Sequence, residues 1–143
     1  MMGITTLLLM LTGFQGLTQI QLFQLSHPSL GLMTTLIFAF TETFTITFIS
    51  ALVKSVTPIV SKDTSKNLSD IRSLVYKQGM LSLLWITVVF LLGGAVDTNL
   101  LPPFLHGMIF LLGFVHYFYV LKLQHQSFGY CLNSTGESII SEE

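Results

Sequence analysis

The stretch AFTETFTITF, residues 39–48, decides what kind of fold this chain adopts. Threonine stands at every second position from Thr41 to Thr47, and the residues between are mostly phenylalanine and isoleucine. This alternation is typical of a β-strand. The stretch also carries one carboxylate, Glu42, among aromatic neighbours. It is therefore either a strand or a membrane helix with a charge in its apolar length, and these alternatives belong to different classes of protein.

A helix accounts for the stretch better than a strand. At about 100° per residue, Phe40 and Phe44 fall almost opposite Glu42, so the large rings can face lipid while small residues surround the carboxylate. The residues that share the side of Glu42, within about 60°, are Thr35, Ala39, Thr45, Ile46 and Ile49. In a strand, Glu42 would share one face with large apolar side chains. An open strand also cannot cross a bilayer.

Composition points to the bilayer as the solvent of this chain. Of its 143 residues, 51% are hydrophobic and 9% are charged, and its mean hydropathy is +0.73. Soluble domains carry about a quarter charged residues. The chain shows no nucleotide-binding loop and no basic stripe, so we expect no nucleic-acid partner. A single cysteine, Cys131, allows no disulfide within the chain.

Four apolar stretches approach the roughly 20 residues that a membrane-spanning helix needs. They predict an all-α integral membrane protein, a four-helix bundle of antiparallel hairpins within residues 1–126. The expected spans are about 4–25, 30–53, 80–96 and 100–121. Residues 54–79 read as a polar loop, with an interfacial helix near 69–78, and residues 127–143 as a polar, mobile tail.

The basic residues predict the orientation of these spans. All six lie in the expected loop or at the end of the last span: Lys54, Lys62, Lys66, Arg72, Lys77 and Lys122. Basic residues favour the cytoplasmic side of a membrane. We therefore expect a multi-pass protein with both termini and the 54–79 loop in the cytoplasm. The turns at His27 and Asp97 would face outward.

Glu42 is the main candidate for a functional site. We expect it near the middle of the bilayer, where a charge costs about 2.5–3.5 kcal/mol and is usually paired or functional. Burial would favour its protonated form. One hypothesis is a proton or cation site, another is a hydrogen bond that holds the bundle together, and a third is a contact with another chain. The polar residues that could join it are Thr35, Thr45, Gln15, Gln19 and His116.

The histidines raise the possibility of haem b or of a metal. His106 and His116 lie about 15 Å apart along one helix, so they cannot bind the same iron. His27 is the one histidine that could pair with His106 on the outer side, in a haem site or in a metal site that includes Asp97. His116 has no histidine partner within the chain. The alternative for His106 and His116 is hydrogen-bonded helix packing.

Two motifs support a resemblance to other proteins. LLGGAVDTNLLPPFLHGMIFLLGF, with the earlier segments HP and TETFTITFISALVK, resembles a loose group of uncharacterised bacterial four-span membrane proteins. This resemblance implies the four-span fold and no particular activity. FTETFTI also looks like the carboxylate helix of the ring subunit of rotary ATP synthases. That subunit has two spans and a glycine-rich first helix, so we interpret the likeness as convergence.

These observations lead to three functional hypotheses. The first is a non-enzymatic accessory protein or subunit that packs, within the lipid bilayer, against a larger membrane complex or a second copy of itself. The second is proton- or cation-coupled transport that uses Glu42. The third is a haem- or quinone-associated subunit in electron transfer. No Ser/His/Asp set converges on one face, so the sequence does not support hydrolase chemistry.

Overall fold

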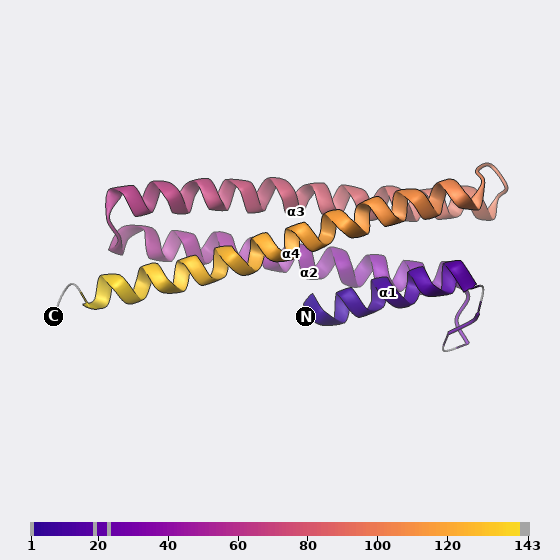
Figure 1. Cartoon of the computed structure of the whole chain (residues 1–143), viewed down its shortest axis with the longest axis horizontal. Coiled ribbons are helices and arrows are strands. Elements are labelled where there is room, and N and C mark those ends of the chain that lie inside the picture. The colour runs from indigo at the N-terminus through magenta and orange to yellow at the C-terminus, as the bar shows by residue number, and fades with distance from the viewer. Residues whose placement is uncertain (1, 19, 23, 141–143) are drawn as a thin grey trace.

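The chain folds into long helices that lie side by side (Figure 1). The computed structural model describes residues 2–18, 20–22 and 24–140. These residues contain α1 (Met2–Thr18), α2 (His27–Val56), the short 3₁₀ helix η1 (Thr57–Ile59), α3 (Lys62–Asp97) and α4 (Pro103–Ile140). Across this described part there is no strand, so residues 39–48 are helical as predicted.

The four α-helices do not share one length. α2, α3 and α4 contain 30, 36 and 38 residues, or about 45–57 Å at 1.5 Å per residue. They run antiparallel in chain order along the long axis of the molecule (Figure 1). α1 has 17 residues, begins about half-way along that axis, and lies against α2 and α4. One half of the molecule is thus a four-helix bundle and the other half a three-helix bundle.

Buried side chains recur at alternating spacings of three and four residues, which keeps one stripe of each helix on its neighbours. On α3 the buried positions are Leu68, Val75, Gly79, Ser82, Ile86 and Val89. On α4 they are Tyr117, Val120, Gln124, Ser127, Cys131 and Ser134. α2 contacts all three other helices and buries residues on two sides. Phe40, Phe44 and Phe48 are exposed, as the predicted helix orientation requires.

The helix expected near 69–78 is present as part of α3, but the rest of the expected polar loop at 54–79 is wrong for most of its length, because α2 continues to Val56 and α3 begins at Lys62. The Ser61 side chain accepts a hydrogen bond from the Thr64 amide and so caps the helix. Leu68 and Val75 then pack in an apolar cluster with residues of α2 and α4. Charged side chains on the exposed face give this segment a polar composition, although it contains an apolar stripe.

The polar, mobile tail expected at 127–143 is also wrong as far as Ile140, because α4 continues to that residue. Its core stripe there is built from small residues, Ser127, Cys131 and Ser134, which carry little hydropathy signal. The Ser127 and Ser134 hydroxyls donate to carbonyls four residues earlier, at 2.7 and 2.9 Å. These bonds satisfy the hydroxyls inside the bundle. Residues 141–143 lie outside the described part.

The first predicted span, 4–25, is shortened to α1, which ends at Thr18. The chain then turns back, with Gln24 at a positive φ of 59°. The Gln15 side chain donates to the Leu25 carbonyl at 2.8 Å, which ties the end of α1 to the turn. Residues 20–22 and Gln24 of this polar run are therefore part of a connection rather than of a helix.

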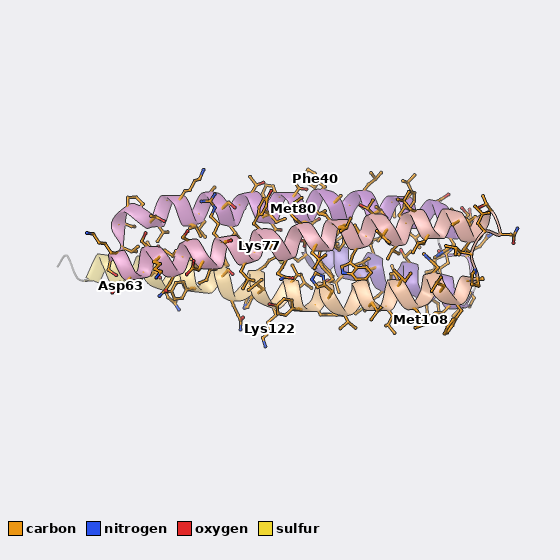
Figure 2. All side chains as sticks on the ribbon, turned by 90° about the horizontal axis from the view of Figure 1, so that it is seen from above. Phe40, Asp63, Lys77, Met80, Met108 and Lys122 are labelled. Atoms are coloured by element: carbon orange, nitrogen blue, oxygen red, sulfur yellow. The ribbon has the colours of Figure 1, made fainter. Side chains whose placement is uncertain are left out.

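Three helices, α2, α3 and α4, are long and apolar enough to cross a membrane, and α1 is a shorter apolar helix. Figure 2 shows Lys77 and Lys122 at a similar level along the molecule, with Met108 toward one end and Asp63 toward the other. Between that level and the turn after Asp97, α3 and α4 each run for about 30 Å. This length is close to the thickness of the bilayer core.

Candidate functional site

Glu42 of α2 lies in the centre of the bundle against Gln124 of α4. The two side chains are 0% and 1% exposed. The Gln124 Nε2 donates a hydrogen bond to the Glu42 Oε2 at 2.9 Å. The other two oxygens of the pair, Glu42 Oε1 and Gln124 Oε1, are buried and have no hydrogen-bond partner. A buried pair with two unsatisfied acceptors is unusual in a folded protein.

Gly79 lets α3 approach this pair closely. A methyl group at Gly79 would lie 2.5 Å from the Ile46 Cδ1 and 3.5 Å from the Glu42 Oε2. A larger residue here would therefore displace the Ile46 side chain, and glycine allows the close approach that small residues give between membrane helices. The backbone of α3 closes one side of the Glu42 site.

The level of Glu42 along the bundle follows from its contacts. Glu42 lies level with Gly79 and Gln124, which it contacts across the bundle. Lys77 and Lys122 each stand two residues away from these contacts, or about 3 Å along their helices. Glu42 is thus at the end of the apolar half, beside the level where the first basic residues emerge.

Two pairs of threonines join α1 to α2, and the first pair lies beside this site. The Thr5 hydroxyl donates to the Thr41 hydroxyl at 3.1 Å, and the hydroxyls of Thr12 and Thr34 share a hydrogen bond of 2.7 Å. Both pairs are buried and lie seven residues apart on each helix, as an antiparallel pair requires. The Tyr117 hydroxyl of α4 lies beside Thr5. These bonds fix how α1 sits on its neighbours.

The predicted companions of Glu42 are only partly assembled around it. Thr45 is buried one turn along α2, and its hydroxyl donates to the Thr41 carbonyl at 2.8 Å. Thr35 is half-buried, and its neighbour Thr34 makes the contact to α1. Gln15 lies near the far end of α1, about 15 Å from Thr5, and bonds Leu25 instead. Gln19 lies outside the described residues.

Sequence reasoning missed the direct partner of Glu42, which is Gln124. The signal that could have found it is the spacing of Tyr117, Val120, Gln124 and Ser127, which continues the core stripe of α4 past the expected end of the last span. The heptad spacing of the threonines on α1 and α2 was equally visible. Both signals depend on polar side chains, which a pattern of hydrophobic residues does not mark.

His116 joins α3 to α4 and does not contact Glu42. The Ser82 hydroxyl lies 3.2 Å from its Nδ1, and its Nε2 lies 3.1 Å from the Gln78 Oε1. The Gln78 oxygen can only accept, so the Nε2 donates and the Nδ1 accepts from Ser82. A neutral ring satisfies both bonds. This geometry matches the helix-packing alternative for His116.

His27 and His106 come together at the other end of the apolar half. Their ring centroids are 6.3 Å apart, with ring planes at 77°. The rings lie against Gly16 and Gly93, respectively, and both Nδ1 atoms are buried without a partner. Among the described residues no group of three or more His, Cys, Asp or Glu side chains is placed to hold a metal ion. The pair links all four helices, because its two glycines belong to α1 and α3.

A haem between these histidines does not fit the packing around them. One turn farther along α4, Phe110 lines an apolar cavity of about 20 Å³, together with Leu9, Phe38 and Trp85. Such a cavity holds about one water molecule. A porphyrin would require the helices to move apart. The rings of His27 and His106 instead fill the space left by two glycines.

The chain was also compared with known proteins. No family model, no curated protein and no solved structure matches it. Its function therefore has to be argued from the arrangement of its own residues.

Proposed function

We propose that this chain is a small multi-pass membrane protein without enzymatic activity, which packs in a membrane assembly through one face of α2 and α4. In this proposal the apolar half of the bundle crosses the bilayer. The half that contains η1 extends into the cytoplasm, in agreement with the distribution of basic residues. An apolar helix of another chain covers the part of α2 and α4 that α1 leaves open.

The observation that carries this proposal is a row of uncovered aromatic rings. Phe40, Phe44 and Phe48 stack along α2 with centroid separations of 6.5 and 6.3 Å. Phe48 also contacts Phe128 of α4 at 6.1 Å, across the groove between the two helices. All four rings are at least 38% exposed. Contiguous exposed apolar patches of this kind mark interaction sites.

Lipid covers only part of this row. Glu42 marks the level of Lys77 and Lys122, and Phe48 and Phe128 lie beyond it, toward the half that contains η1. On that half α3 exposes polar side chains such as Lys66, Asp70 and Lys77. A surface beside those charges is outside the hydrocarbon core, so its aromatic rings need a protein partner to leave water.

α1 indicates the kind of partner that suits this surface. It is an apolar helix without charges, and it lies against α2 and α4 over the other half of the molecule. Its contacts combine ring packing around Phe38 and Tyr117 with threonine pairs. A second apolar helix placed in line with α1 would cover Phe48 and Phe128 in the same way. That helix comes from another subunit or from a second copy of this chain.

The polar groups of the bundle support a structural role. Between the described helices they bond one another, through Thr5 to Thr41, Thr12 to Thr34, and His116 to both Ser82 and Gln78. These contacts join every helix to a neighbour, which is the usual use of polar residues in membrane bundles. Transport and electron transfer remain the other hypotheses, and the small apolar cavity offers neither a water path nor a cofactor pocket.

Site-specific photo-crosslinking in native membranes tests this proposal. A photoreactive phenylalanine analogue at position 48 should yield a protein adduct, because another helix covers that ring. The matched control is Phe90, an exposed phenylalanine in the apolar half of α3, where only lipid adducts are expected. An adduct of twice the monomer mass identifies a second copy, and any other discrete mass identifies a different subunit. Lipid adducts alone at both positions would refute the proposal.

A further inference from the structure

The unsatisfied oxygens at the Glu42 site have a common explanation. Glu42 Oε2 already accepts from the Gln124 Nε2, and Glu42 Oε1 and Gln124 Oε1 both lack a donor. Each of these atoms belongs to a planar group with two polar atoms side by side. A single proton on the Glu42 Oε1 would supply the missing donor to the Gln124 Oε1. The carboxylic acid and the amide would then form a ring closed by two hydrogen bonds.

We propose that Glu42 and Gln124 form a proton-binding site, in which a neutral carboxylic acid pairs with the amide across α2 and α4. A protonated carboxylic acid offers one O–H donor and one carbonyl acceptor. The amide offers an N–H donor and a carbonyl acceptor in the same relative positions. The pairing leaves neither oxygen unsatisfied. It also explains how a glutamate can be fully buried within an apolar bundle.

The described residues around Glu42 supply no cation that would balance a negative charge. α1 carries no charged residue along its described length. From α3 the neighbour is Gly79, and the next residue along that helix, Gln78, is neutral and bonded to His116. From α4 the titratable neighbour is Tyr117. Lys77 and Lys122 are exposed on the bundle surface, and Gln124 is the hydrogen-bond partner that Glu42 has.

Loss of the proton would change the contact between the helices. The O–H bond of Glu42 breaks, the proton passes to water, and the electron pair stays on the Oε1. The resulting carboxylate then faces the carbonyl oxygen of Gln124, which repels it. Because this pair joins α2 to α4 at the level where α1 begins, deprotonation loosens the bundle beside the aromatic row.

Infrared spectroscopy of the purified full-length protein tests the site. The wild-type protein at neutral pH should show the C=O stretch of a protonated carboxyl, and Glu42→Gln should abolish it. Asp70→Asn, which changes an exposed carboxylate on α3, should leave the band unchanged. Gln124→Leu should shift the band to the frequency of an acid without an amide partner. Gln126→Leu, an exposed control on the same helix, should not shift it.

The pH dependence of stability gives a second readout that does not depend on assigning a band. A folded state that holds the proton is destabilised as pH rises above about 4.3, where an unfolded glutamate releases its own. The thermal midpoint of the wild type should therefore fall toward alkaline pH. Glu42→Gln should remain folded, because two amides can form the same ring, and should lose this dependence. A wild-type protein without the band, or a band that survives Glu42→Gln, would overturn the proposal. So would a band that Gln124→Leu does not shift.

Discussion

At the scale of single residues, the polar side chains of this bundle are distinguished by their partners. Hydroxyls that face solvent or lipid, such as Thr47, donate to their own helix. Buried Thr45 and Ser127 do the same, whereas buried Thr12 also bonds across to the next helix. An unpaired hydroxyl would be costly in an apolar interior, so the position of each pair fixes the register of α1 on α2. A shift of one residue would separate both threonine pairs.

Replacing Thr12 and Thr34 with valine measures the strength of one such pair. Each single variant should lower the free energy of unfolding by about 0.5–1.5 kcal/mol, because valine keeps the shape and removes the hydrogen bond. The double variant should cost less than the sum of the two, which a double-mutant cycle in detergent would reveal. Thr47→Val, on the exposed face, is the control and should have little effect. Additive effects of the two variants would contradict a direct bond.

At the scale of elements, the periodicity of the sequence predicted that residues 39–48 are helical and which face of α2 is exposed. It did not predict where the helices begin and end. Phe40 and Phe44 were correctly placed away from Glu42, since a helical angle depends on residue spacing alone. The first turns of α3, before residue 69, and the end of α4 were missed, because their stripes contain small or isolated core residues among many polar ones. Leu68 and Cys131 show that such a stripe still packs completely.

The helical state of residues 62–79 predicts resistance to trypsin. Lys66, Arg72 and Lys77 would be cut rapidly in a flexible loop, but helical backbone must open before cleavage. The folded protein in detergent should therefore survive brief digestion at these sites. Leu68→Ala should raise the cleavage rate, because removing a buried leucine costs about 2–5 kcal/mol. Ser69→Ala, at an exposed position, should not. Rapid cleavage of the wild type at Arg72 would contradict the packed helix.

At the scale of the whole molecule, the partner of Glu42 could not be predicted from the sequence. Glu42 and Gln124 are 82 positions apart, and nothing local indicates which stripe of α4 meets which stripe of α2. Their contact depends on α4 extending past the apolar segment and on α1 ending half-way along the bundle (Figure 1). The same arrangement leaves aromatic rings of α2 and α4 uncovered in the half of the molecule where α3 exposes charged residues. The proposed proton site and the proposed partner surface are therefore neighbours.

The central claim is that the apolar half crosses a membrane while the half that contains η1 stays on one side of it. Cysteine accessibility tests this claim most directly. With Cys131→Ser as the background, Asn67→Cys on α3 and Leu100→Cys in the turn before α4 each supply one exposed thiol. A membrane-impermeant maleimide should label position 100 from outside intact cells, and position 67 only in inverted vesicles. Labelling of both positions from the same side would contradict the account.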